Sequence, residues 1–150
     1  MGGSCDRYDA LKLGSQLCFP LYAAAREVIK QYRPYLDEVG LTYTQYVAMM
    51  VFWEQGSISV KELGKRLFLD SGTLTPVLKS LEAKGFVRRS RSKEDERVVI
   101  AELTDKGEAL KEEAVTIPER MAGCLELSAE EAAQLYVLLY KILDSLSAGE

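Results

Sequence analysis

The chain of 150 residues contains no histidine, which excludes catalysis by Ser-His or Cys-His pairs and most zinc sites. It has three cysteines, an odd number without Cys-x-x-Cys spacing, so the sequence does not predict the disulfide framework of a secreted protein. No apolar run approaches the ~18 residues that a membrane span needs, and no basic-then-apolar signal segment opens the chain. These absences favour a cytoplasmic protein that is not an enzyme and that uses no metal or cofactor.

What the sequence does contain is the pattern of a winged helix-turn-helix over residues 59–103. Ser59 and Glu62 have capping-box spacing at the start of a short helix. A second helix follows the turn at residues 69–72 and ends at Gly85. Two β-prone runs around a charged tip then predict a hairpin. Helix, turn, helix and hairpin is the order of a winged helix-turn-helix, which sets its second helix in the DNA major groove.

Charge supports a DNA-binding face in the same stretch. Residues 61–97 carry ten Lys and Arg against six Asp and Glu, a net of +4, whereas the whole chain carries −4. A basic island in an acidic protein indicates a phosphate-binding surface, and random clustering of surface charge is the alternative. Six basic residues are expected to contact phosphates: Lys65, Arg66, Lys79, Arg88, Arg89 and Lys93. Three small polar side chains are expected closest to base edges: Ser71, Thr73 and Thr75.

The N-terminal part of the chain is predicted to be helical over residues 10–36, after a flexible tail at residues 1–9. Pro20 is tolerated only in a first turn, so either a helix begins beside it or a longer helix bends there. A helix beginning there would place Cys18 at its positive end, which favours a thiolate, with Tyr22 one turn further on. From spacing alone, a small buried cysteine and tyrosines used for packing remain the alternative.

Helices on both sides of the winged segment carry more apolar surface than a small core can cover. A core helix is predicted after the capping box at Thr42, a long helix after Thr104 is broken at Pro118, and a last helix follows the capping box at Ser128. We therefore expect a homodimer, whose two-fold symmetry suits DNA. The predicted organisation is mainly α with a small β wing, in four parts: a tail at 1–9, N-terminal sensing and dimerisation helices at 10–58, the DNA-binding unit at 59–103 and C-terminal dimerisation helices at 104–150.

Several of these segments resemble the MarR family, and within it the OhrR group of repressors that sense organic hydroperoxides. The similarity runs from about Leu11 to Leu146. The matching segments are Gln16-Leu17-Cys18-Phe19, Leu21-Tyr22-Ala23-Ala24, Arg26, Tyr32, Leu41-Thr42-Tyr43, Gln45-Tyr46, Leu69-Asp70-Ser71-Gly72-Thr73-Leu74-Thr75-Pro76 and Asp95-Glu96-Arg97.

The resemblance implies a role for each matching residue. Cys18 matches the peroxide-reactive thiolate, and Tyr22, Tyr32 and Tyr43 match tyrosines that hydrogen-bond it, some of them from the partner subunit. The start of the recognition helix matches Asp70, Ser71, Thr73 and Thr75. The wing tip matches Asp95 and Arg97, the arginine entering the minor groove of a pseudo-palindromic operator, where it reads groove width rather than base identity.

The family has two chemical outcomes after the thiolate becomes sulfenic acid. In the one-cysteine type the sulfenic acid is trapped by a small thiol or over-oxidised. In the two-cysteine type a resolving cysteine of the other subunit forms an intersubunit disulfide. Cys124 lies in the matching region and favours the two-cysteine type, while Cys5 is a weaker candidate. Pro20 departs from the ordinary helix former that the resemblance leads one to expect.

Two other functions fit parts of the sequence. A MarR-type repressor could be gated by a small phenolic or apolar ligand, with Cys18 as packing, and Cys18→Ser would then leave induction intact. A thiol peroxidase is the second alternative, but neither a histidine nor a Cys-x-x-Cys pair supports turnover.

Overall fold

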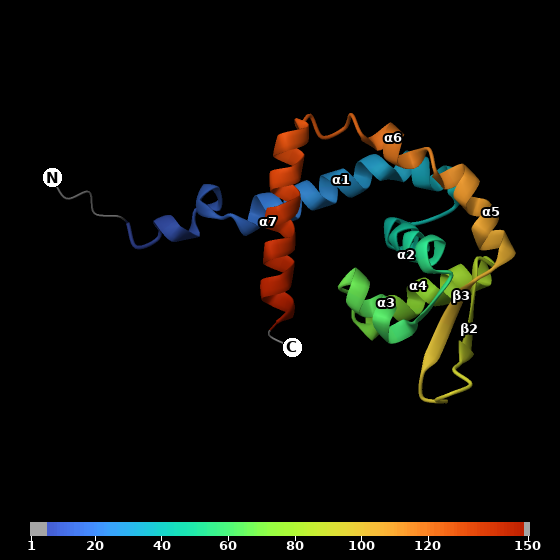
Figure 1. Ribbon diagram of the computed structural model, residues 1–150. Coiled ribbons are helices and arrows are strands. Elements are labelled where there is room, and N and C mark those ends of the chain that lie inside the picture. Colours follow the sequence, from blue (N-terminus) through green and yellow to red (C-terminus); the bar gives the residue numbers. More distant parts are fainter. Residues whose placement is uncertain (1–5, 149–150) are drawn as a thin grey trace. The chain divides into compact units, whose positions relative to one another are not determined.

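The computed structural model of the protein describes residues 6–148 and confirms the predicted class, mainly helical with a small antiparallel sheet (Figure 1). Two compact units divide between Pro118 and Glu119, inside the short helix α6. The elements in chain order are two 3-10 turns (Asp9–Leu11, Leu13–Ser15), α1 (Cys18–Val39), α2 (Tyr43–Gln55), β1 (Ser57–Ser59), α3 (Val60–Leu67), α4 (Ser71–Ala83), β2 (Val87–Arg91), β3 (Val99–Leu103), α5 (Asp105–Ala114), α6 (Ile117–Met121) and α7 (Ala129–Ser147).

Side-chain caps fix where the helices begin. Thr42 and Gln45 form a complete capping box at α2, and Ser128 and Glu131 form another at α7. Ser59 accepts a hydrogen bond from the Glu62 amide at α3, as its spacing predicts. Each cap satisfies backbone donors that would otherwise have no partner, so short polar signals in the sequence set the register of the longer apolar faces.

Helix α2 forms the centre of the first unit. Tyr46, Ala48, Met49 and Phe52 are at most 2% exposed, as expected for a core helix. Met50 on the same helix is 40% exposed. Because α2 is in contact with α1, α3, α4 and α5, a movement of its first turn reaches both the N-terminal helix and the winged segment.

The wing is a three-stranded antiparallel sheet in the order β1-β3-β2. β2 and β3 form the predicted hairpin, with Val87 opposite Leu103 and Arg91 opposite Val99. β1 pairs with β3 on its other side, with Ser57 opposite Glu102 and Ser59 opposite Ile100. In Figure 1 the hairpin extends away from the helices of the first unit, a position from which its tip can reach a bound molecule.

Two predicted helix limits are wrong. Residues 10–17 are not part of α1, because the chain makes two separate 3-10 turns before Leu17 caps the helix. Pro20 therefore lies in the first turn of α1, where a missing amide costs no helical bond, so the first of the two alternatives for this proline is confirmed. The helix after Thr104 ends at Ala114 rather than at Pro118, which lies near the start of α6.

The second unit consists mainly of α7, none of whose described residues is buried. Its exposed apolar side chains are Leu135, Tyr136, Val137, Leu138, Tyr140, Ile142 and Leu146. Exposed apolar surface of this extent is typical of an association face. Among residues 6–148, no helix combines the length and apolar character that crossing a bilayer requires. Cys5 and the first five residues of the predicted tail lie outside the described residues.

Gly107 in the first turn of α5 is held against the wing. Its amide donates to Thr104 Oγ1 at 3.1 Å and its carbonyl accepts from Trp53 Nε1 at 2.9 Å. A Cβ at this position would collide with the carbonyl oxygen of Phe86 and lie 2.7 Å from Leu103 Cδ1. The absence of a side chain at Gly107 is therefore what lets α5 start so close to the sheet.

Gly107→Ala is predicted to destabilise the fold by about 3 kcal/mol, because backbone at Phe86 must move to admit the methyl group. Thermal unfolding followed by circular dichroism should show a fall in Tm of roughly 6 to 12 °C. Gly123→Ala is the control, since a Cβ there meets nothing within 4 Å. Equal melting temperatures for the two variants would contradict the packing at Gly107.

Candidate functional site

The start of α4 presents the side chains that the sequence places nearest to DNA bases. Asp70 caps the helix, since its Oδ1 accepts from the Thr73 amide at 2.7 Å. That hydrogen bond holds the pKa of the Asp70 carboxyl below its usual value. Ser71 and Thr73 are exposed, while Thr75 is half-buried and donates its hydroxyl proton to the Ser71 carbonyl at 2.7 Å. Asp70 thus fixes the start of the helix, and the side chains of Ser71 and Thr73 are exposed in its first turn.

Most of the basic side chains predicted to contact phosphates are in ion pairs on the surface. Arg88 pairs with Glu102 at 3.1 Å and Lys65 with Glu62 at 3.4 Å. The remaining pairs of this kind are Arg89 with Glu82 at 2.7 Å and Arg66 with Glu54. Exposed pairs are worth only about 0–1 kcal/mol, so a phosphate can replace their carboxylates at little cost.

Lys79 and Lys93 are exposed and make no ion pair within residues 6–148. Arg89 has a further effect, because its hydrogen bond to Glu82 lowers the pKa of that carboxyl. Glu82, on α4, therefore stays ionised beside Arg89 of β2.

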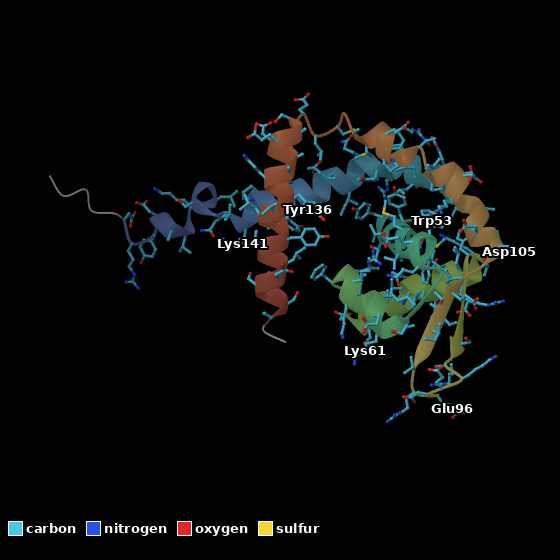
Figure 2. All side chains as sticks on the ribbon, viewed as in Figure 1. Trp53, Lys61, Glu96, Asp105, Tyr136 and Lys141 are labelled. Carbon is cyan, nitrogen blue, oxygen red and sulfur yellow. The ribbon has the colours of Figure 1, made fainter. Side chains whose placement is uncertain are left out.

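The wing tip is fixed by Asp95 and Arg97. Asp95 Oδ1 accepts from the Arg97 amide and from Arg97 Nε, both at 3.0 Å, and Oδ2 accepts from Nη2 at 3.2 Å. This contact with Arg97 lowers the pKa of Asp95. Arg91 also braces the tip by donating to the Glu96 carbonyl at 2.8 Å (Figure 2, where Glu96 is labelled). Arg97 is nevertheless 91% exposed, so its guanidinium extends from an ordered tip into solvent.

Between α3, α4 and the wing lies a cavity of about 520 Å³ whose lining includes Lys61, Thr75, Arg89 and Arg97. Three of these four residues were expected at the DNA-binding face, and the structure brings them together from different elements. Lys61, labelled in Figure 2, was missed by sequence reasoning although it belongs to the same basic stretch. Its place in the first turn of α3 could have been inferred from the capping box that starts that helix.

Cys18 is the first residue of α1 and is exposed. Leu17 caps the helix without a side-chain hydrogen bond, so unpaired backbone amides of the first turn remain near the sulfur. Groups of negative charge are favoured at such a helix terminus. Tyr22 lies one turn further along α1 and is 61% exposed, with the Arg26 guanidinium 5.3 Å from its ring centre.

Three tyrosines form a cluster where the C-terminal half of α1 packs against the first turn of α2. The ring centres of Tyr32 and Tyr43 are 5.0 Å apart, and Tyr46 lies 6.0 and 6.3 Å from them. Burial raises the pKa of Tyr43, and it raises the pKa of Tyr46 to about 12. Both phenols therefore remain protonated at neutral pH and can donate hydrogen bonds.

Helix length keeps Cys18 away from this cluster within one chain. Fourteen residues of α1 separate Cys18 from Tyr32, and at about 1.5 Å per residue this amounts to roughly 21 Å along the axis. Because Tyr43 packs on Tyr32, it is equally remote from the sulfur. A contact between Cys18 and either tyrosine accordingly requires a second copy of the chain.

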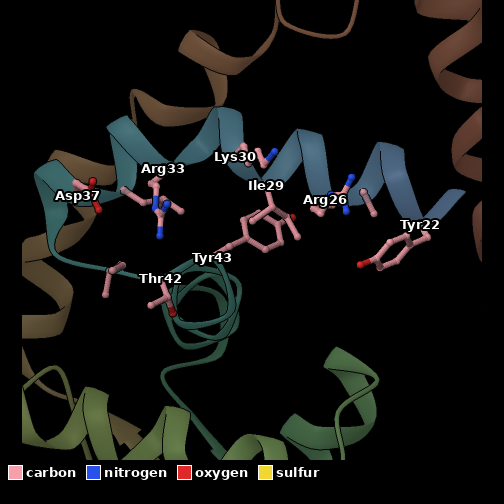
Figure 3. A pocket seen from close by; sticks show the side chains of 11 residues that line it. Tyr22, Arg26, Ile29, Lys30, Arg33, Asp37, Thr42 and Tyr43 are labelled. Carbon is pink, nitrogen blue, oxygen red and sulfur yellow. The ribbon is translucent and has the colours of Figure 1, made fainter. Parts of the chain in front are cut away.

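Figure 3 shows a hollow between α1 and the start of α2, of about 590 Å³. Tyr22 and Tyr43, two of the residues predicted to hydrogen-bond the thiol, both line it. Arg26, Lys30 and Arg33 add three cations that sequence reasoning did not assign to a site. Successive steps of four, four and three residues from Tyr22 put them on one helical face, which is the signal that could have identified them.

Cys124 follows α6 and is exposed, with its Sγ 3.9 Å from the Arg120 carbonyl oxygen. It belongs to the second unit, whereas Cys18 belongs to the first. Exposure makes each thiol reachable by a reagent. Among residues 6–148, no cluster of three His, Cys, Asp or Glu side chains is arranged to hold a metal ion.

Tyr46→Phe is predicted to flatten the loss of stability at alkaline pH. Tyr46 is 2% exposed, and its pKa of about 12 in the fold exceeds the ordinary value of 10.0. The unfolded chain therefore releases this proton first, so the stabilising effect is complete below pH 10 and is lost as the pH rises towards 12. Two pKa units correspond to about 2 to 3 kcal/mol.

Urea unfolding at pH 7 and at pH 11 measures this difference. The wild type should lose about 1.4 kcal/mol more than Tyr46→Phe between the two conditions, because pH 11 lies halfway between the pKa values of the unfolded and folded states. Identical losses of stability in the two proteins would contradict a raised pKa for the buried Tyr46 phenol.

Comparison with known proteins shows which family the chain belongs to. Residues 30–114 match the family described as transcriptional regulator SarA/Rot. The chain is 48% identical over 141 residues, 94% of its length and 96% of the relative, to the organic hydroperoxide resistance transcriptional regulator of Bacillus subtilis strain 168. Among solved structures, reduced AbfR bound to DNA is 32% identical with a TM-score of 0.77, over 92% of this chain and 94% of that one. Disulfide-formed AbfR is 34% identical with a TM-score of 0.65, over 91% and 93%. The order of a winged helix-turn-helix, the segment around Cys18 and these similarities agree that the chain belongs to the MarR family of transcriptional regulators, in its OhrR group, and not to a family of enzymes.

Proposed function

We propose that the protein is a homodimeric repressor that binds a pseudo-palindromic operator while Cys18 is reduced and releases it when an organic hydroperoxide oxidises Cys18. The observation that carries the proposal is the position of Cys18, exposed at the start of a 22-residue helix. Two of the tyrosines that match its family partners are remote from it: Tyr32 lies roughly 21 Å further along that helix, and Tyr43 of α2 packs on Tyr32. A second copy must supply them, which makes the sulfur site and the dimer interface a single structure.

The dimer itself is supported by apolar side chains that the single chain leaves in water. On α1 these include Phe19, Leu21 and Ile29, each 39–44% exposed, and on α7 they form most of the exposed set named above. Burying such surface against a second copy stabilises the pair by roughly 25 cal/mol per Å² of apolar area. N- and C-terminal dimerisation helices on either side of the winged segment follow from this placement, and they set the spacing between two recognition helices.

The chemistry at Cys18 balances without a cofactor. The thiolate attacks the terminal oxygen of the hydroperoxide, the O–O bond breaks, and the alkoxide leaves and takes a proton to become an alcohol. Sulfur keeps the attacked oxygen, with its hydrogen, as sulfenic acid. In the two-cysteine course, the thiol of Cys124 from the partner attacks that sulfur, releases water and closes a disulfide. Phenol groups of Tyr22, Tyr32 and Tyr43 would stabilise the thiolate by hydrogen bonding.

DNA binding is supported by the first turn of α4 and the tip of the wing. Ser71, Thr73 and Thr75 would stand at base edges, with Asp70 holding the helix start, while Arg97 would enter the minor groove from a tip braced by Asp95. Basic side chains around them would exchange surface carboxylates for phosphates. Loss of the operator then needs only a few kcal/mol of differential stability between the reduced and oxidised dimers.

The hollow between α1 and α2 supports a second candidate function. Its volume of about 590 Å³ and its lining of Tyr22, Ile29 and three cations would suit a small phenolic acid. In that case the protein is a ligand-gated regulator, and oxidation of Cys18 plays no part. The two functions differ in whether Cys18→Ser still responds to its inducer.

The deciding experiment measures operator affinity before and after treatment with cumene hydroperoxide. The DNA is a duplex enriched from a random-sequence library by the reduced protein, and binding is followed by fluorescence anisotropy. Wild type should lose at least about tenfold in affinity on oxidation, whereas Cys18→Ser should lose none. A hydroperoxide effect that survives in Cys18→Ser would overturn the sensor proposal.

Cys124→Ser in the same assay separates the two chemical courses. In the two-cysteine course, non-reducing electrophoresis shows a covalent dimer in wild type that is absent from both serine variants. In the one-cysteine course, wild type and Cys124→Ser both stay as single chains and respond alike to the peroxide with a small thiol present.

Lys79→Ala is predicted to weaken binding to all DNA sequences alike. The exposed ammonium has no carboxylate partner among the described residues, so it is available to a phosphate. Losing one phosphate contact should reduce the slope of log K against log salt by about 1. Lys111→Ala on α5 is the control and should keep the wild-type slope. An unchanged slope in Lys79→Ala would remove this residue from the interface.

A further inference from the structure

One buried polar side chain joins the sensing helices to the recognition helix. Gln45, in the first turn of α2, is only 7% exposed, and its amide is nevertheless fully engaged with neighbouring elements. Its Oε1 accepts from Lys84 Nζ at 2.9 Å and from the Thr42 amide at 3.1 Å. Its Nε2 lies 2.9 Å from Ser80 Oγ. Ser80 lies in the last turn of α4 and Lys84 caps the C-terminal end of that helix, which presents Ser71 and Thr73 at its other end.

Lys84 ties in a third helix. Its ammonium also donates to the carbonyl of Gly40, at 2.6 Å, and Gly40 ends α1 in a left-handed conformation. The end of α1, the start of α2 and the end of α4 therefore meet at one set of hydrogen bonds. We call Gln45, Ser80 and Lys84 the helix junction.

The helix junction lies next to the tyrosine cluster. Tyr43 is the first residue of α2 and Tyr46 directly follows Gln45. Tyr43 packs on Tyr32 with ring centres 5.0 Å apart. A change in what the Tyr43 phenol binds thus acts on the turn that carries Gln45.

Directional bonds suit this position better than the apolar contacts around it. Contact between apolar side chains is non-directional, so it resists separation of α2 from α4 but tolerates a small rotation. Hydrogen bonds near 2.9 Å fail when either partner turns far out of line. The end of α4 must therefore follow the first turn of α2.

A small rotation at the helix junction is amplified at the DNA-reading end. Nine residues of α4 separate Ser80 from Ser71, which corresponds to roughly 13 Å at about 1.5 Å per residue. A pivot of about 10° at Ser80 then displaces Ser71 by roughly 2 Å, enough to break hydrogen bonds to base edges.

We propose that Gln45, Ser80 and Lys84 are positioning residues that transmit the oxidation of Cys18 to the recognition helix. The inference rests on the proposed function, because it concerns how a signal at the sulfur reaches DNA. These residues touch neither the thiol nor the bases. They set the angle of α4 in response to the tyrosine end of α2.

The test measures coupling apart from binding and apart from chemistry. Full-length wild type and variants are titrated against the enriched duplex, reduced and after cumene hydroperoxide, and the ratio of the two Kd values gives the coupling. Sulfenic acid at Cys18 is quantified by dimedone labelling and mass spectrometry in the same samples.

Gln45→Met keeps the length of the side chain and removes its hydrogen bonds. It should lower the Kd ratio by at least about threefold relative to a wild-type ratio of at least about tenfold, with Cys18 labelled to the same extent. Gln45→Glu should keep most of the ratio, since a carboxylate still accepts from Lys84 and Thr42 and the Ser80 hydroxyl can turn to donate. Gln55→Met, at the exposed end of the same helix, should match wild type.

A wild-type Kd ratio in Gln45→Met with normal labelling overturns the inference and leaves the sensor intact. Equal loss of the ratio in Gln45→Glu or Gln55→Met also overturns it, because the effect would then be general damage to α2. A wild-type protein whose ratio stays at one overturns the proposed function, and the inference with it. If Gln45→Met does not fold, Ser80→Ala decides by the same ratio, as it removes one hydroxyl from a half-buried site.

Discussion

The length of α1 is the constraint on which the rest of the structure depends. A thiol at the first residue of a 22-residue helix and tyrosines near that helix's far end cannot meet within one chain. Pro34 lies inside α1 without ending it, so the distance is kept. In the proposed sensor, each chain therefore holds both halves of a sulfur site but no complete site. Sensing would then be conditional on pairing, because a separated chain would have neither the hydrogen bonds from Tyr32 and Tyr43 to its thiol nor the second recognition helix.

Helix α2 connects the tyrosine cluster to the winged segment. It carries Tyr43 and Tyr46 at its start, supplies the three largest fully buried side chains, Tyr46, Met49 and Phe52, and touches the winged segment through α3 and α4. Its two kinds of contact have different mechanical effects. The apolar face built from Met49 and Phe52 stabilises the unit, and the polar first turn around Gln45 fixes orientation. A single helix of 13 residues thus combines apolar contacts that stabilise the core with polar contacts that set its orientation relative to α4.

The helices and strands could be predicted from local signals in the sequence, whereas contacts between distant residues could not. The capping boxes at Thr42 and Ser128 and the left-handed Gly85 were readable because a cap needs only three or four neighbouring residues. The 3-10 turns before Cys18 were missed because the apolar residues between positions 10 and 17 have helical spacing, and Pro20 allowed either a helix start or a bend. The bond from Gln45 to Ser80 spans 35 residues, and no local rule pairs a glutamine with a serine at that distance. Lys61 was overlooked for the same reason, since it joins Arg89 and Arg97 only once the wing folds back on α3.

Weak surface electrostatics completes the physical picture of a reversible regulator. Arg66, Arg88 and Arg89 are each held by a carboxylate in the free protein, and those carboxylates compete with phosphate. Because exposed pairs contribute about 0–1 kcal/mol, they order the basic side chains without trapping them. They also reduce the net gain from each phosphate contact, which keeps total affinity within reach of a modest change in geometry. Without these carboxylates, the sequence-independent attraction of the arginines to phosphates would be stronger. In the proposed mechanism, the acidic partners on the DNA-facing side therefore help a modest change in geometry to control binding.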